Sequence, residues 1–162
     1  MWRNKFKTTI LPIIDKLFRL ALSITGNKED AEDVVQDVVL HILKKDDWEK
    51  IENIEAYCFR SIRNRALDKI ALKDNQTEAL PEGFDCTAQE NIEKIYEAQE
   101  QVELVEKWLT KFPEKQQTIF RLREVEGLNY KEIAAVLNIT ELQVKITLFR
   151  LRLKLKEYFN SY

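Results

Sequence analysis

Glycine and proline, on which most tight turns depend, are scarce in this chain. Each occurs three times in 162 residues, whereas average usage is about 7% for glycine and about 5% for proline. All-β folds and doubly wound parallel sheets need such residues in their many turns. The scarcity argues against both architectures and predicts an all-α protein.

Long uncharged stretches are missing as well. The longest, 20–27 and 133–140, have eight residues each, far fewer than the roughly 20 that a membrane-spanning helix needs. The first residues carry three cations before an apolar run, but no small-residue cleavage site follows. A hydrophobic content of 44% with 33% charged residues is typical of a globular domain. We therefore expect a cytoplasmic protein that does not insert into a membrane.

Residues for enzyme chemistry are few. Cys58 and Cys86 are the only cysteines, which is neither a disulfide framework nor a four-ligand zinc pattern. The chain has no glycine-rich phosphate loop and no nucleophile elbow. A catalytic triad could be built only around His41, the single histidine, which lies beside an apolar helical face as a structural histidine does. We expect no catalytic activity, no metal, no cofactor and no small-molecule substrate.

The first half of the chain has the spacing of three helices. Apolar residues three and four apart predict a helix from Ile10 to the stop signal at Gly26. A second helix is predicted over 28–45, with acidic residues in its first turns, where the helix dipole favours them. After a polar connection over 46–52, Asn53 can cap a third helix that continues to about residue 70. Together these form a small bundle.

An acidic stretch separates this bundle from the second half. Residues 74–107 hold ten acidic and two basic side chains, a net charge of -8. Pro81 and Gly83 indicate a flexible linker, and helical spacing returns from about Thr87. Pro113 suits the first position of a further helix that Gly127 closes. We therefore predict two domains, 1–73 and 91–162, joined by an acidic linker over 74–90.

A helix-turn-helix pattern follows Gly127. Asn129 can cap a short helix over 130–137, a turn over 138–140 follows, and a long helix runs from Glu141 to about residue 158. Asn138 suits the left-handed conformation of such a turn. Any pair of antiparallel helices with a short loop could have the same pattern, so this alternative stays open.

Two helices combine cations with aromatic or apolar side chains. In the last helix a predicted buried stripe of Val144, Leu148, Leu151 and Leu155 leaves cations, an isoleucine and Phe149 on other faces. Such a mixture suits the major groove, because Arg and Lys reach guanine and apolar groups contact the thymine methyl. The alternative is that Phe149 makes a second core contact. The third helix has a local net charge of +4 with interleaved aromatics, which suits unstacked bases or a merely solvated face.

Three motifs together resemble a known family. They are GNKEDAEDVVQDV at 26–38, AYCFR at 56–60 with Asn64 and Asp68, and YKEIA at 130–134 leading to Val144-Lys145 and FRLR at 149–152. From about residue 15 to 159 the chain resembles an extracytoplasmic-function (ECF) sigma factor of bacterial RNA polymerase, in the sigma-70 family. The resemblance implies that region 2, in the first domain, binds the polymerase clamp and melts the minus-10 element. It implies that region 4, in the second, reads the minus-35 element as duplex.

The resemblance also implies roles for matching residues. The core polymerase-binding face would comprise Asp33, Gln36 and Asp37. The minus-10 element would meet Trp48, Tyr57, Arg60, Arg63 and Asn64. The minus-35 element would meet Lys145, Ile146, Phe149, Arg150 and Arg152. The implied partners are core RNA polymerase, through its clamp and flap, and promoter DNA, with an anti-sigma factor as a plausible third. The alternative is a free-standing helix-turn-helix regulator of duplex operators, whose first bundle serves dimerisation or effector binding.

Overall fold

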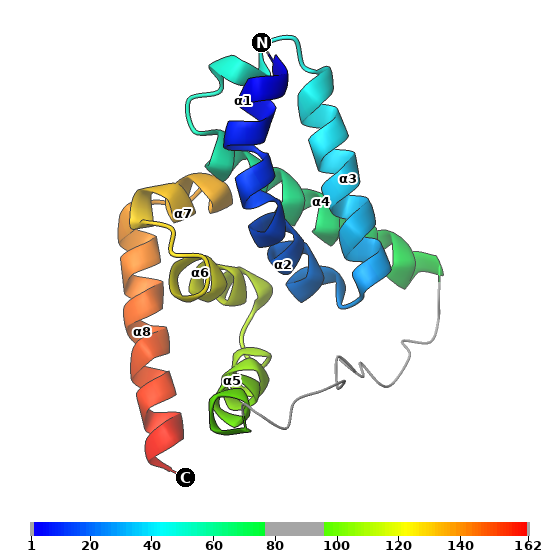
Figure 1. Ribbon diagram of the computed structural model, residues 1–162. Coiled ribbons are helices and arrows are strands. Elements are labelled where there is room, and N and C mark those ends of the chain that lie inside the picture. The colour runs from blue at the N-terminus through cyan, green and yellow to red at the C-terminus, as the bar shows by residue number, and fades with distance from the viewer. Residues whose placement is uncertain (1, 77–95, 162) are drawn as a thin grey trace. The chain divides into compact units, whose positions relative to one another are not determined.

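The computed structural model describes residues 2–76 and 96–161, and this part of the chain is built from α-helices and two short 3-10 helices (Figure 1). The predicted all-α class is confirmed. The chain divides into two compact units, Met1–Cys86 and Thr87–Tyr162. Among the described residues, no helix is long and apolar enough to cross a membrane.

The first unit begins with a break that the sequence analysis missed. Helix α1 (Trp2–Thr9) is followed by the 3-10 helix η1 (Leu11–Ile13) and by α2 (Ile14–Thr25). The prediction of one helix starting at Ile10 is therefore wrong over its first four residues. Pro12 explains the break, because proline has no amide hydrogen and its ring clashes with the preceding turn of an α-helix. The predicted stop is confirmed, since Gly26 takes the left-handed conformation with φ +79°.

Helices α3 (Lys28–Lys44) and α4 (Ile54–Gln76) complete the first bundle, with the 3-10 helix η2 (Trp48–Lys50) between them. Asn27 caps α3 by accepting a hydrogen bond from the Asp30 amide at 2.8 Å. Helix α4 includes the first three residues of the predicted linker, 74–76, and its last turns carry Lys73, which pairs with Asp30 on α3. The rest of the predicted linker, 77–90, lies outside the described residues.

The core of the first unit lies where α2, α3 and α4 pack on one another. Leu17, Val34, Phe59 and Ile62 are fully buried there. The Cys58 thiol is also buried, and this burial, with the charge of Glu55, raises its pKa to about 12. Cys58 is therefore a protonated packing residue, in line with the expected free thiol.

The second unit consists of α5 (Tyr96–Leu109), α6 (Glu114–Glu124), α7 (Tyr130–Leu137) and α8 (Glu141–Asn160). Pro113 was predicted at the first position of this helix, but it is the N-cap residue, and α6 begins at Glu114. The helix ends at Glu124, three residues before Gly127. The core cluster comprises Trp108, Leu109, Phe120 and Leu151. The rings of Trp108 and Phe120 meet edge to face at 5.7 Å, a favourable aromatic geometry.

Candidate nucleic-acid and partner interfaces

The second unit contains the predicted helix-turn-helix. Asn129 and Glu132 form a reciprocal capping box at the start of α7, with hydrogen bonds of 2.8 and 3.1 Å. Thr140 and Gln143 form a second capping box at the start of α8. Asn138 has φ +53° in the turn. Each cap satisfies amides that would otherwise lack a partner, so the turn and both helix starts are fixed by local residues.

Helix α8 has a buried stripe and an exposed apolar stripe. Val144, Leu148 and Leu151 are buried as predicted, and Leu155 is half-buried. At about 100° per residue, an arc of about 60° on the other side holds four exposed apolar side chains. These are Leu142, Ile146, Phe149 and Leu153, with exposed fractions of 65%, 41%, 65% and 48%.

The exposed stripe of α8 argues for a partner. The 65% exposure of Phe149 rules against the alternative that this ring makes a second core contact. Lys145 and Arg150, both exposed, border the stripe on opposite edges, each about 40° beyond it. Apolar groups flanked by long cations match the chemistry of base edges in the major groove.

Arg152 has a different environment from the other minus-35 candidates. Its Nε and Nη2 donate to the same carboxylate oxygen of Glu124, at 2.9 and 2.7 Å. Hydrogen bonding to Glu124 raises the pKa of the Arg152 guanidinium above its ordinary value. Partial burial opposes this effect, and Tyr130 adds to it. Arg152 therefore links α8 to the end of α6. Sequence reasoning missed this pairing because Glu124 and Arg152 are 28 positions apart.

The minus-10 candidates on α4 lie partly on one face. Tyr57, Arg60 and Asn64 share an arc of about 60°, and Arg63 lies about 60° to one side of it. Arg60 and Asn64 are exposed, while Tyr57 and Arg63 are half-buried. The Nζ of Lys45 donates a hydrogen bond to the Tyr57 hydroxyl and lies 4.8 Å from the ring centroid. Lys45 is thus a neighbour of this face that the sequence analysis did not single out.

Trp48 stands apart from the other minus-10 candidates. Its side chain is 4% exposed and belongs to the core of the first unit. A ring at this depth cannot stack on a base in this conformation. It holds the connection over 46–52 in place from inside.

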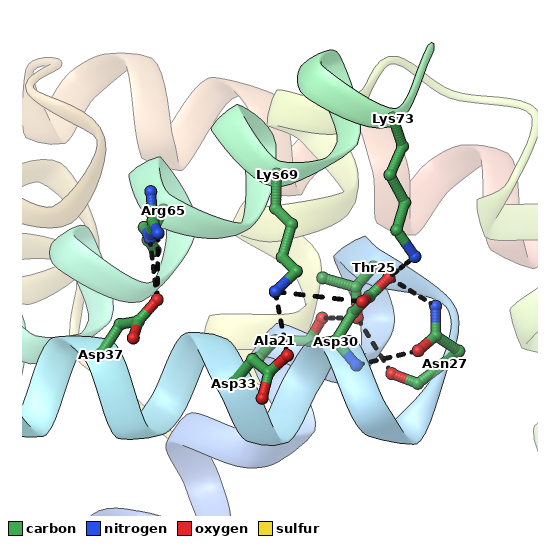
Figure 2. Close-up of polar contacts among 9 residues, drawn as sticks. All are labelled: Ala21, Thr25, Asn27, Asp30, Asp33, Asp37, Arg65, Lys69 and Lys73. Atoms are coloured by element: carbon green, nitrogen blue, oxygen red, sulfur yellow. Dashed lines mark hydrogen bonds and ion pairs between the residues drawn. The ribbon is translucent and has the colours of Figure 1, made fainter. Parts of the chain in front are cut away.

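An ion-pair ladder joins the acidic side of α3 to the basic side of α4 (Figure 2). Asp37 accepts from Arg65 at 3.0 Å, and Asp33 accepts from Lys69 at 3.2 Å. At the end of the ladder Asp30 pairs with Lys73, and it lies 3.9 Å from Lys69.

The ladder leaves part of the acidic face available. The side chains of Asp33 and Asp37 are 59% and 48% exposed, and Gln36 is exposed as well. The core-polymerase candidates therefore lie together on one side of α3, where their outer oxygens can still meet a basic partner. These ion pairs cannot be predicted from the residue spacing within α3 or within α4, because the partners come from different helices.

Asp30 is the most buried carboxyl of the ladder. Burial would raise its pKa, but hydrogen bonds from Lys73 and Asn27, together with the charges of Lys73 and Lys69, outweigh that effect. The pKa of the Asp30 carboxyl is therefore held below its ordinary value.

The second unit also has an apolar groove, with a volume of about 530 Å³, between α5, α6 and the end of α8. Val102, Val105, Phe120 and Phe159 are among the side chains that line it. Glu106 and Arg121 also line the groove, where they form two hydrogen bonds of 2.7 and 2.6 Å. A groove of this kind suits an apolar segment of another protein.

Comparison with known families gives two matches on this chain. The family described as sigma-70 region 2 matches residues 5–76, and the one described as sigma-70 region 4 matches residues 103–155. The first match falls within the first unit, and the second covers the second half of α5, all of α6 and α7, and most of α8.

Relatives are found over most of the chain. It is 29% identical over 147 residues to the ECF RNA polymerase sigma factor SigE of Mycolicibacterium smegmatis, covering 89% of this chain and 57% of that protein. The chain thus spans little more than half the length of that relative. It is 24% identical over 151 residues to SigM of Bacillus subtilis, covering 91% of this chain and 90% of that protein.

Solved structures share the fold. The sigma factor RpoE of Bartonella quintana, in complex with the anti-sigma factor NepR, matches with a TM-score of 0.69 at 20% identity, covering 96% of this chain and 97% of that chain. CnrH, in complex with the cytosolic domain of CnrY, matches with a TM-score of 0.67 at 21% identity, covering 98% and 90%. At these identities the likeness concerns the fold alone.

Proposed function

The chain belongs to the sigma-70 family, as an ECF sigma factor, and we propose that it binds core RNA polymerase and directs it to promoters through minus-10 and minus-35 DNA. One observation carries the proposal: region 2 and region 4 occur together, in two compact units of one chain. A free-standing regulator has a use for the helix-turn-helix, but no evident use for a region 2.

In the first unit we propose that Asp33, Gln36 and Asp37 bind a basic element of the polymerase clamp. Their exposed oxygens lie on one side of α3, and opposite charges across an interface favour both encounter and register. A cation on the clamp would compete with Arg65 and Lys69 for the same carboxylates. We therefore expect the clamp contact to be sensitive to salt.

For the minus-10 element we propose the exposed face of α4. Tyr57 offers a ring on which an unstacked base can lie, and such stacking contributes about 1 to 3 kcal/mol per base. Arg60 and Asn64 share the arc of Tyr57. Arg63, which lies to one side of that arc, would contact the DNA backbone. Trp48, being buried, supports the 46–52 connection and makes no DNA contact.

For the minus-35 element we propose that α8 enters the major groove of the duplex. Lys145 and Arg150 would reach guanine acceptors, and Ile146 and Phe149 would contact thymine methyl groups. Arg152, held by Glu124, would support α8 by linking it to the end of α6. The polymerase flap would fill the apolar groove between α5, α6 and α8.

The remaining roles follow from these partners. RNA synthesis belongs to the polymerase, so we assign no catalytic activity and no cofactor to this chain. A factor that works on polymerase and promoter DNA acts in the cytoplasm. An anti-sigma factor is a further proposed partner, of the kind seen with the Bartonella relative.

Co-purification with core polymerase tests the proposal. The tagged chain should retain core polymerase on a column, and the complex should bind a minus-10/minus-35 promoter fragment that neither component binds alone. Sequence-specific binding of duplex DNA by the free chain, without any association with core polymerase, would instead establish the free-standing regulator.

A further inference from the structure

Two basic side chains lie over the ring of Tyr130, the first residue of α7. The Cζ of Arg123, near the end of α6, lies 4.8 Å from the centroid of the Tyr130 ring. The Nζ of Lys145, on α8, lies 5.8 Å from the same centroid. One half-buried ring therefore contacts cations from the helices on either side of α7.

The contact with Lys145 lies on a defined side of α8. Lys145 and Arg152 are seven positions apart, about two helical turns, and so point to the same side of α8. A cation is attracted to the face of an aromatic ring when it lies within about 6 Å of the centroid. Tyr130 thus gives the flexible Lys145 side chain a fixed partner at one edge of the exposed stripe.

The two cations that border this stripe differ in this respect. Arg150, at the opposite edge, makes no ring contact or ion pair in the part of the chain that the structure describes. Lys145 alone of the two is held by a neighbouring helix. Arg152, which lies on the same side of α8 as Lys145, is held by Glu124 at the end of α6, with donor–acceptor distances of 2.7 and 2.9 Å.

We infer that Tyr130 is a positioning residue for minus-35 recognition: its ring orients Lys145 toward a base edge. This inference rests on the proposed function, since it presupposes that α8 reads the minus-35 duplex. Tyr130 itself contacts no base. Its influence on specificity passes through Lys145.

The test uses holoenzyme assembled with the full chain, and a panel of promoter fragments that differ one base pair at a time in the minus-35 element. The variants are Tyr130→Leu, Tyr130→Phe, Lys145→Ala and the double variant Tyr130→Leu with Lys145→Ala. Tyr130→Leu removes the aromatic face, whereas Tyr130→Phe keeps it and loses only the hydroxyl. Affinity for each fragment is measured at several salt concentrations.

We expect Tyr130→Leu and Lys145→Ala to lose discrimination at the same base pair, by about five- to tenfold, the lower part of the range for one good base contact. The double variant should lose no more at that base pair than either single variant. Tyr130→Phe should keep the wild-type pattern. Loss of one phosphate contact changes the slope of log affinity against log salt concentration by about one unit. Lys145→Ala and Tyr130→Leu should each change this slope by less than that.

Three results would overturn the inference. Tyr130→Leu could lower affinity equally for every fragment with a salt slope reduced by about one, which would make Tyr130 part of a phosphate contact. Its loss could add to that of Lys145→Ala, which would make the two residues independent. Tyr130→Phe could lose discrimination as Tyr130→Leu does, which would assign the effect to the hydroxyl.

Two controls keep the test decisive. If Tyr130→Leu lowers the melting temperature of the free chain by more than about 10 °C, Tyr130→Met takes its place with the same expected pattern, because it keeps apolar volume without an aromatic face. Wild-type holoenzyme must itself discriminate among the fragments. Without that discrimination the proposed function fails, whereas discrimination that Tyr130→Leu leaves intact and Lys145→Ala abolishes refutes the positioning role alone.

Discussion

At the scale of single residues, the exposed side of α8 separates groups that can read bases from groups that can only attract DNA. Arg150 borders the exposed stripe within reach of base edges in the proposed complex. Lys154 lies with its Nζ 5.3 Å from the centroid of the Phe112 ring, toward the body of the second unit. The two cations have the same charge. A difference in DNA binding between the Arg150 and Lys154 variants therefore reflects where each side chain lies on α8.

We predict that Arg150→Ala costs about 1 to 3 kcal/mol of holoenzyme affinity on the preferred minus-35 sequence and relaxes discrimination at one base pair. Lys154→Ala is the matched control, because it should weaken binding to all sequences alike and reduce the salt slope by about one unit if it meets a phosphate. Affinities for a set of minus-35 variants at several salt concentrations measure both. An equal loss for every variant with Arg150→Ala, at unchanged thermal stability, would leave Arg150 only a phosphate role.

Asp30 gives a prediction on pH. Its carboxyl has a pKa below the ordinary 3.8 in the folded chain, so it stabilises the fold at pH values above 3.8, and this contribution is lost as the pH falls through the folded pKa. Asp30→Asn should therefore be less stable than wild type near neutral pH, with a difference that shrinks toward zero under acid conditions.

Urea unfolding of the full chain, followed by circular dichroism from pH 7 down to pH 2, measures this difference. Glu29→Gln is the control, because it removes the same charge from an exposed residue in the same turn. A stability gap between wild type and Asp30→Asn that stays constant over the whole range would show that the carboxylate charge does not contribute.

At the scale of helices, the sequence predicted best those helix starts that are fixed by residues close by in the chain. Helix α7 and the start of α8 lie where they were predicted, because Asn129 and Thr140 cap them within three residues. The start of α2 was missed because the apolar spacing continues through Pro12, whose effect on the backbone outweighs it. The pairing of Arg65 with Asp37 spans 28 positions, and no periodicity within either helix indicates it.

The same limit applies to the candidate interfaces. The exposure of Ile146 and Phe149 follows from their phase relative to Val144 and Leu148, and it could be predicted. The burial of Trp48 and the pairing of Arg152 depend on tertiary packing, so the family resemblance placed both among residues that meet DNA. The structure shows that Trp48 is buried and that Arg152 pairs with Glu124, and on these grounds we propose supporting roles for both.

The acidic side of α3 gives a prediction at this scale. Gln36→Ala combined with Asp37→Lys should weaken binding to core polymerase by several kcal/mol, because a charge reversal places like charges together at the interface. The folded chain should lose little stability, since an exposed ion pair such as Asp37 with Arg65 contributes about 0 to 1 kcal/mol.

Arg65→Gln is the control for this prediction. It breaks the same ion pair but leaves Asp37 in place, so core binding should persist. Affinity for core polymerase is measured by titration with the labelled chain. Wild-type affinity of the folded double variant would refute the assignment of this face to the clamp.

At the scale of the whole molecule, charge is segregated along a chain whose net charge is only -2. The first part of the acidic stretch, the predicted linker, has the sign of a nucleic acid strand and is expected to lie in a basic channel of the polymerase. We predict that replacing residues 77–90 with a neutral Gly/Ser sequence of equal length reduces holoenzyme assembly or initiation. Run-off transcription at several salt concentrations measures the effect, and unchanged initiation throughout would make the segment only a tether.

The central claim is that this chain gives core RNA polymerase its choice of promoter. Run-off transcription with purified core polymerase over a genomic fragment library tests it most directly, because activity and promoter sequence are found in one measurement. With the chain present, we predict discrete transcripts from fragments that share minus-35 and minus-10 elements, absent with core polymerase alone and reduced by Gln36→Ala with Asp37→Lys. The same transcripts with and without the chain, at concentrations that saturate core polymerase, would contradict the account.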